Sequence, residues 1–273
     1  MPNPTLYHFS GSTCSQKVRM VLAEKGVEFI SREIDLTKGE QHAPEYVVLN
    51  ADHVVPTLVA DGEVLVESTL ICEFIDDRYP GSPLRSADPH QRYRAAALVN
   101  FLDTRLHGKV TGVLTHALLT RAAMSQRTVD QVAAYLAAIP DPAERALRTS
   151  LLTHGAQAPE IPGAIDALAR YFHRLEQHLA VYPWLSGDAF GIADATVLPY
   201  VVRFRELRFE SFWNEGARPA VEHWLDRAVT RPSFDRAFTD WSSAPLVAAF
   251  GAIGGAAAPV VDPLIKAATR AAG

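Results

Sequence analysis

The hydrophobic and polar positions of the first eighty or so residues predict alternating strands and helices. Residues 5–9 form a short β-rich run, after which Val18, Val21 and Leu22 recur at helical spacing until a glycine ends the pattern. Residues 27–34 are typical of a second strand. This order of strand, helix and strand predicts a β-α-β unit with a right-handed crossover.

Two further strands and a helix complete this first region. Residues 57–59 and 64–66 are expected to be strands, separated by a tight turn around Gly62. The next helix is expected to open at Glu67 and to end at Pro80. The sum is a small mixed sheet covered by helices, which is an α+β arrangement (βαβ-ββα).

Beyond Asp88 the strand signal nearly vanishes, and Ala- and Leu-rich segments at helical spacing follow one another. These expected helical segments are residues 90–123, 128–138, 142–154, 163–180, 193–209 and 218–231. The second half of the chain is therefore predicted to be all-α.

The C-terminal tail, residues 246–273, is rich in Ala, Gly and Pro and is expected to be partly disordered. The most apolar segment, residues 245–261, is broken by Pro and Gly and falls short of the roughly 20 residues that a membrane-spanning helix needs. We therefore expect no membrane partner.

Composition narrows the class of protein further. The chain has 273 residues, enough for two domains, and 48% of them are hydrophobic. The formal net charge is −5 with no sustained basic block, which argues against a nucleic-acid partner. Two cysteines cannot form a disulfide framework, and the N-terminus has no signal-peptide pattern, so we expect a cytoplasmic protein. The ten histidines have no metal-ligand spacing, and no metal is expected.

The stretch STCSQKVR, residues 12–19, gathers hydroxyl and thiol side chains at the expected junction of strand and helix. Cys14 could be a reactive thiol, Ser12 or Ser15 could be the working hydroxyl, or the stretch could be only a polar helix cap. The residues alone leave these alternatives open.

Several motifs, in order along the chain, resemble those of the soluble glutathione transferases. They are FSGSTCSQKVRMVLAEKGVEF, KGEQHAPEYVVLN, VVPTLVADG, VESTLICEFIDDRYP and WLSGDAFGIADATVLPYV. The segment TVDQVAAYLAAIPDPAERALRTSLLTHG is closest to bacterial β-etherase-like members, which cleave aryl ethers with glutathione. The resemblance implies a thioredoxin-like domain over residues 1–83 and an all-α domain over 88–245, with the second-substrate pocket between them. It also implies a homodimer.

The resemblance implies that glutathione is the co-substrate and assigns residues to two of its ends. A cis Val55–Pro56 bond would present the Val55 backbone to the cysteinyl part. Gln41 or His42 would reach the glycyl carboxylate, and Val54 stands where a polar side chain often touches the same end.

The other end of glutathione, the γ-glutamyl group, is assigned to a helix N-terminus. Ser68 and the free amides there would take its carboxylate, and Glu67 would take its ammonium group. Asp103 stands where an acidic residue of a partner subunit often approaches the same amine. One departure from the family pattern is His53, which replaces a glycine in the turn before Val55 and is tolerable because histidine visits positive φ.

The thiol-activating group is ranked by register. Ser12 falls on the active-site serine of zeta-, tau- and phi-like transferases, and Ser15 on that of theta-like enzymes. Cys14 matches neither position and ranks third, while Tyr7 is expected to pack in the sheet.

These residues predict a glutathione transferase that directs a thiolate at a hydrophobic electrophile, with an aryl ether as a substrate hypothesis. Two alternatives stay open. An omega-like thiol reductase would use Cys14, and a non-catalytic protein would only bind glutathione.

Overall fold

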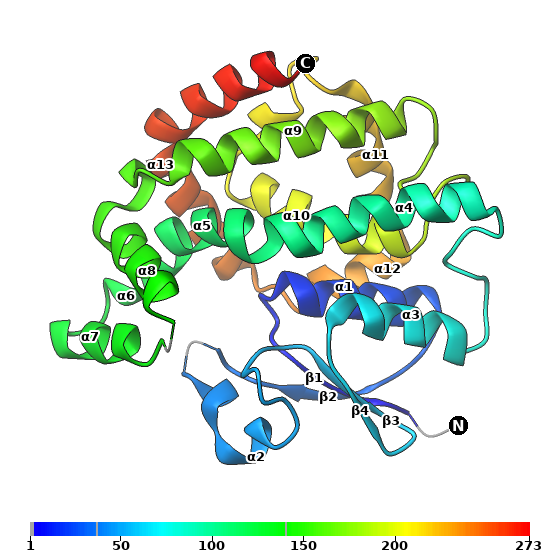
Figure 1. Cartoon of the computed structure of the whole chain (residues 1–273). Coiled ribbons are helices and arrows are strands. Elements are labelled where there is room, and N and C mark those ends of the chain that lie inside the picture. The colour runs from blue at the N-terminus through cyan, green and yellow to red at the C-terminus, as the bar shows by residue number, and fades with distance from the viewer. Residues whose placement is uncertain (1–2, 37, 140) are drawn as a thin grey trace. The chain divides into compact units, whose positions relative to one another are not determined.

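The structure is a computed structural model that describes residues 3–36, 38–139 and 141–273 (Figure 1). The chain divides into two compact units. The first unit comprises residues 1–99, 178–203 and 223–244, and the second comprises residues 100–177, 204–222 and 245–273. Each unit therefore draws on separate stretches of sequence, and the domain limits at 83 and 88 stay a prediction.

The first unit contains the mixed four-stranded sheet that the sequence predicted (Figure 1). Its strands, in the order β2-β1-β3-β4, are β1 (Thr5–His8), β2 (Ile30–Glu33), β3 (Thr57–Ala60) and β4 (Glu63–Leu65). β2 runs parallel to β1, and the other neighbours are antiparallel. Leu6 and Leu58 oppose each other in register and are fully buried, so they form the middle of the core beneath the helices.

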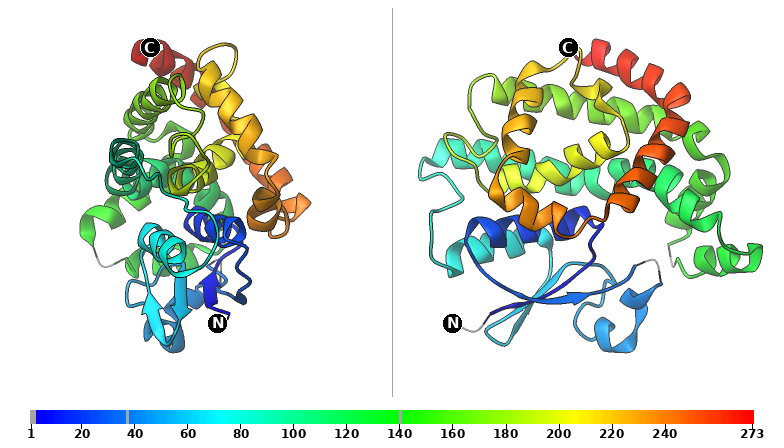
Figure 2. Two further views of the ribbon diagram at one scale, coloured as in Figure 1. Left: turned by 90° about the vertical axis from the view of Figure 1, so that its right-hand side faces the viewer. Right: turned by 180° about the vertical axis from the view of Figure 1, so that it is seen from behind.

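Helices α1 (Thr13–Glu24) and α3 (Ser68–Arg78) pack side by side on the sheet (Figure 1). The segment between β2 and β3, for which no helix or strand was predicted, forms two short helices, η1 (Glu40–His42) and α2 (Pro44–Val47). Two short C-terminal elements, α12 (Pro232–Phe234) and η6 (Asp235–Thr239), lie against α1 (Figure 2).

Several helices contain residues of both units. Among them are α4 (Pro89–Phe101), α10 (Ile192–Glu206) and α11 (Pro219–Val229). At the start of α10 the buried Asp194 carboxylate accepts from the N–H of Gly191 at 3.0 Å and from Trp224 Nε1 at 2.8 Å. This motif is a helix cap and a packing element of the first unit.

The second unit is all-helical, as predicted. Its elements are η2 (Leu102–Thr111), α5 (Gly112–Thr115), η3 (His116–Thr120), α6 (Arg121–Met124), α7 (Val129–Ala137), α8 (Pro142–His154), η4 (Gly155–Gln157), α9 (Ile161–Leu179), η5 (Glu210–Phe212) and α13 (Ala244–Ala272). The expected single helix over residues 90–123 contains two π-helical stretches, η2 and η3. Stacked rings fill the core, with Phe172 and Phe212 centroids 5.0 Å apart.

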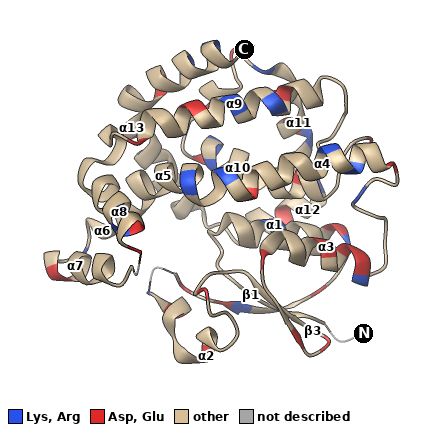
Figure 3. Cartoon of the chain, viewed as in Figure 1, with Lys and Arg blue, Asp and Glu red and all other residues tan. Residues whose placement is uncertain are grey.

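The expectation of a partly disordered tail is wrong, because residues 244–272 form the 29-residue helix α13. Seven of its residues are buried, and its few charged residues lie toward its C-terminal end (Figure 3). The expectation that the apolar stretch is too short is also corrected, since α13 is long and apolar enough to cross a membrane by length and composition. One such helix is weak evidence for a membrane span.

Candidate functional site

The register of the sheet brings the predicted site segments to one edge. Tyr7 pairs with Thr57, so the chain leaving β1 faces the chain entering β3. Leu58 pairs with Leu65, so the end of β4 reaches the same edge. The first turn of α1, the turn before β3 and the start of α3 therefore meet there. All three belong to the first unit.

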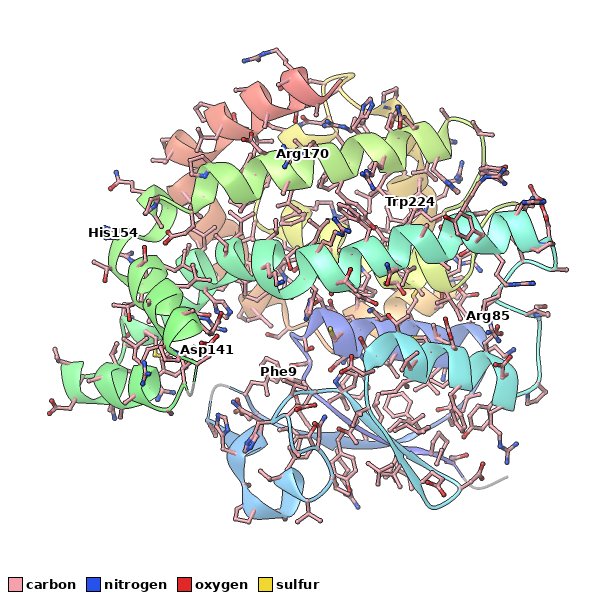
Figure 4. The ribbon with its side chains drawn as sticks, viewed as in Figure 1. Phe9, Arg85, Asp141, His154, Arg170 and Trp224 are labelled. Carbon is pink, nitrogen blue, oxygen red and sulfur yellow. The ribbon has the colours of Figure 1, made fainter. Side chains whose placement is uncertain are left out.

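Ser12 is the N-cap of α1, and its side-chain oxygen accepts from the N–H of Ser15 at 3.3 Å. In this cap the Ser12 oxygen acts only as an acceptor, so the cap does not use the hydroxyl proton. Ser15 differs because it is fully buried and its Oγ accepts from the N–H of Phe9 at 3.3 Å (Phe9 is labelled in Figure 4). The two candidate serines thus have different environments, with Ser12 half-buried and Ser15 closed off from solvent.

Cys14 lies in the first turn of α1, between the two serines, and is half-buried. Its Sγ is 3.8 Å from the hydroxyl oxygen of Tyr200 on α10. The second cysteine, Cys72, is buried within α3. A thiol at a helix N-terminus is in a setting that favours the thiolate.

The Val55–Pro56 peptide bond is cis, as the resemblance implied. The carbonyl of the preceding Val54 is held by Tyr46 Oη at 2.5 Å and by Asn50 Nδ2 at 3.1 Å. Val55 is buried, and among the described residues its N–H and C=O have no hydrogen-bond partner. This turn therefore offers a donor and an acceptor at the same edge as Ser12, while the Val54 side chain is 53% exposed and offers no polar group.

Helix α3 starts at this edge with an unusual backbone. Its N-cap residue, Glu67, has φ 67° and ψ 99°, and its exposed carboxylate makes no capping bond. Ser68 is the first helical residue and is half-buried. The next residue, Thr69, receives a hydrogen bond at 2.9 Å from Nζ of the fully buried Lys17 on α1. The start of α3 therefore combines free amides, a hydroxyl and a nearby ammonium group.

Gln41, His42 and His53 form a chain of hydrogen bonds beside the same turn. Gln41 Nε2 can only donate, so the His42 Nε2 atom 3.2 Å away accepts and the His42 proton lies on Nδ1. His42 Nδ1 then donates to His53 Nδ1 at 3.1 Å, which leaves the proton of His53 on Nε2. The cluster therefore ends in a nitrogen donor, and the buried Gln41 Oε1 has no partner among the described residues.

The sequence did not single out His53 as a site residue, although it did expect its positive φ, which is 56°. Its position two residues before the cis peptide was the available signal. The ring centroids of His42 and His53 are 5.1 Å apart, so the two imidazoles are packed as well as hydrogen-bonded.

Two further sequence candidates remain. Tyr7 packs in the sheet, as expected, with its ring 5.9 Å from that of Tyr46. Asp103 lies on η2, which belongs to the second unit. Burial raises the pKa of Tyr171, and the charge of Asp103 adds to that effect.

Within residues 3–36, 38–139 and 141–273, no group of three or more His, Cys, Asp or Glu side chains could hold a metal ion. The polar groups at the sheet edge are hydroxyls, amides, imidazoles and one carboxylate. Such a set suits an extended ligand that carries carboxylate, amide and ammonium groups.

Comparison with known families gives two matches. The family described as glutathione S-transferase, N-terminal domain, matches residues 11–78, and the C-terminal domain family matches residues 156–227. The first match includes the sheet-edge residues from Ser12 to Thr69.

Curated relatives match over most of their length. The 2,5-dichlorohydroquinone reductive dechlorinase of Sphingobium indicum is 30% identical, over 89% of this chain and 84% of that protein. Protein LigF of a Sphingobium species is 27% identical, over 85% of this chain and 92% of that protein.

Solved structures give the same fold. The beta-etherase LigF from Sphingobium sp. strain SYK-6 has a TM-score of 0.76 at 24% identity, over 88% of this chain and 100% of that chain. A theta class glutathione S-transferase from Xanthomonas axonopodis pv. citri, solved with glutathione bound, has a TM-score of 0.61 at 23% identity, over 87% of this chain and 97% of that chain.

Proposed function

Because the chain belongs to the glutathione S-transferase family, we propose that it ionises bound glutathione and directs the thiolate at a hydrophobic aryl electrophile. One observation carries this proposal: the Ser12 hydroxyl caps α1 through its oxygen alone, beside a cis peptide with an unpaired N–H and C=O. The hydroxyl proton is then available to a sulfur atom bound at this edge.

Glutathione would lie along the sheet edge in three parts. The γ-glutamyl carboxylate would bind at the N-terminus of α3 with Ser68, and its ammonium group would bind Glu67. The cysteinyl part would pair with the Val55 backbone before Pro56. This order is supported by the positions of the three segments along one edge.

The glycyl carboxylate would bind at the chain of Gln41, His42 and His53, past the exposed Val54. The Nε2 donor of His53 and the unpaired Gln41 Oε1 complement a carboxylate and an amide N–H. Asp103 retains its proposed role toward the γ-glutamyl amine of a partner subunit in a homodimer. Analytical ultracentrifugation tests whether the protein is a dimer in solution. The proposed location is the cytoplasm.

The chemical step needs a lowered thiol pKa. A free cysteine thiol has a pKa near 8.5, so little thiolate is present at neutral pH. A hydrogen bond from Ser12 and the amides of the first turn of α1 both favour the charged form. The thiolate then attacks the electrophile and a leaving group departs, which requires no covalent bond to the protein.

An aryl ether is the substrate class to test first, because one relative in fold is a beta-etherase and a sequence relative acts on a chlorinated hydroquinone. The protein is incubated with glutathione and a β-aryl ether, and phenol release is followed. An aryl halide serves as the general conjugation control. Conjugation of the halide without phenol release would exclude aryl ethers as substrates and would still support glutathione transferase activity.

Turnover of a Ser12→Ala variant tests the activating residue, with Ser15→Ala as the comparison. We expect Ser12→Ala to lower kcat at least ten-fold, the loss of about one strong hydrogen bond to a charged group. Wild-type kcat for Ser12→Ala would overturn the assignment. If calorimetry detects glutathione binding but neither electrophile reacts, the chain is a binding protein.

A second candidate function rests on Cys14, which is half-buried in the first turn of α1. Its thiolate could attack a glutathione mixed disulfide, releasing the substrate thiol, and a second glutathione would then release oxidised glutathione. Full disulfide reductase activity in a Cys14→Ser variant would eliminate this function.

A further inference from the structure

Three residues, Phe9, Ser10 and Gly11, lie between β1 and the N-cap residue Ser12 of α1. Arg19 donates to the carbonyl oxygens of the first two, at 3.4 and 3.0 Å. Arg203 of α10 donates to the carbonyl oxygen of the third at 3.0 Å. Three consecutive carbonyls are therefore held by two guanidinium groups, and Ser12 follows directly.

Arg19 is itself held from several sides. It is 1% exposed, its Nε donates to the carbonyl of Ala237 at 2.9 Å, and its guanidinium lies 5.1 Å from the ring centroid of Trp241. Its Nη1 also donates to His8 Nδ1 at 3.0 Å. Because arginine only donates, neutral His8 carries its proton on Nε2, which donates to Ser31 Oγ at 2.8 Å.

The buried charge of Arg19 depends on these neutral acceptors. No carboxylate of the described residues lies within ion-pair distance of Arg19. Burial lowers the pKa of Arg19 to about 9, although the charge of Glu33 opposes this. A buried cation is costly unless its donors are paired. The loop carbonyls therefore stabilise the guanidinium, and the guanidinium in turn fixes the loop.

We propose that Arg19 and Arg203 are positioning residues that fix the direction of the Ser12 hydroxyl. The inference rests on the proposed function, in which that hydroxyl donates to the glutathione sulfur. A short loop that ends in glycine has wide backbone freedom, and each anchored carbonyl restricts the rotation of one peptide unit. Hydrogen bonding depends steeply on direction, so a loosened loop gives a weaker bond to the thiolate.

The charges that face this loop are few. Arg19 comes from α1, Arg203 from α10 and Glu33 from β2, where its Oε1 accepts from the Ser10 N–H at 3.4 Å. His8 of β1 is neutral, because burial and then the charge of Arg19 lower its pKa to about 3. Cys14 of α1 and Tyr200 of α10, whose Sγ and hydroxyl oxygen lie 3.8 Å apart, are further titratable groups on the two helices that carry the arginines. A change in the pH profile of an arginine variant can be traced to this set.

The test is a double-mutant cycle of Arg203→Gln and Ser12→Ala on the full chain. The measurement is kcat/KM for glutathione against pH, with an aryl halide as electrophile. We expect Arg203→Gln alone to lower kcat/KM about ten-fold at neutral pH and to move the midpoint of the kcat/KM–pH profile to higher pH. In the Ser12→Ala background the same substitution should lower kcat/KM less than about two-fold and leave the midpoint of that profile unchanged.

Additive losses in the two backgrounds, with Ser12→Ala impaired, would overturn the positioning role and leave the proposed function intact. Wild-type turnover of Ser12→Ala would remove the assignment of Ser12 and this inference with it, whereas the conjugation itself would still support a glutathione transferase. Arg205→Gln is the matched control, since Arg205 also lies on α10 but has no recorded hydrogen bond to the loop among the described residues. It should change neither quantity.

Arg19→Lys is the second variant, because a neutral residue at this buried position could prevent folding. Lysine keeps the positive charge but lacks the planar guanidinium group whose two Nη atoms donate to the carbonyls of Phe9 and Ser10. We expect folded protein, a kcat/KM about ten-fold lower and unchanged glutathione affinity. An unchanged kcat/KM in Arg19→Lys would show that the hydrogen bonds from the Arg19 guanidinium to the loop are not needed for activity.

Discussion

The Nδ1 atoms of His42 and His53 lie 3.1 Å apart, which joins the short helix η1 to the turn before the cis peptide. One of the two nitrogens must donate and the other must accept. Because Gln41 donates to the far side of His42, the donor of the pair is His42 and the outward-facing donor is His53 Nε2. The two imidazoles therefore act as one polar unit at the proposed glycyl end of glutathione.

His53→Gly should weaken glutathione binding at least about ten-fold, the loss of one hydrogen bond to a charged group. Glycine accepts the positive φ of 56° at this position, so the backbone turn is kept. The measurement is calorimetric titration with glutathione and with γ-glutamylcysteine, which lacks the glycyl carboxylate. The second ligand should bind wild type and variant equally, and equal losses for both ligands would contradict the role of His53.

Glu67→Gly should stabilise the fold while weakening glutathione binding. Glu67 holds φ 67° and ψ 99°, a conformation that costs a residue with a side chain about 1 kcal/mol or more and costs glycine little. Chemical denaturation should give a gain of about 1 kcal/mol, and the lost carboxylate should lower affinity about ten-fold. Glu67→Gln is the control, which keeps the strain and should lose affinity without gaining stability.

The sequence could predict the elements whose signals are local. Short β-rich runs predicted the strands, and apolar positions at helical spacing predicted α1. The Val55–Pro56 pair was recognised from its motif and is cis. His53 was missed as a site residue because its contact with His42 crosses a turn, and nothing in either residue's own neighbourhood indicates that contact.

Glycines illustrate why the rest could not be predicted. From the sequence, Gly191 is an acceptable cap that serine would improve slightly. In the fold, a Cβ on Gly191 would lie 2.0 Å from the carbonyl oxygen of Leu84. That neighbour is more than a hundred positions away in the chain. Composition likewise indicated disorder for the tail, whereas Gly254 allows α13 to approach the turn that follows α10.

Gly254 and its neighbour Gly255 test the packing of α13. A Cβ on Gly254 would lie 1.8 Å from the carbonyl oxygen of Leu207, whereas at Gly255 the nearest atom is 3.9 Å away on Arg208. We expect Gly254→Ala to lower the free energy of unfolding by about 2 kcal/mol or more. Gly255→Ala should raise it by up to about 1 kcal/mol, because alanine favours helix. Equal effects in denaturant titrations would show that α13 is not packed in solution.

Two histidines, the fully buried His8 and the half-buried His116, should make the fold lose stability in mild acid. Burial, followed by the charge of Arg148, lowers the pKa of His116 to about 3, and the pKa of His8 is lowered similarly. Between an unfolded pKa near 6.5 and these folded values, the unfolded chain binds protons that the native state does not. Stability is therefore complete above about pH 6.5 and falls as the pH decreases, by up to about 1.4 kcal/mol per pH unit for each histidine.

His116→Asn isolates one of these contributions. Its unfolding free energy should depend less on pH than that of the wild type between about pH 6 and pH 4, by about 1.4 kcal/mol per unit at most. Carboxylates titrate in both proteins, so their contribution cancels in the difference. His90→Asn, an exposed position on α4, should keep the wild-type slope. If His116→Asn and wild type have parallel curves in denaturant titrations across this range, His116 is not held neutral in the fold.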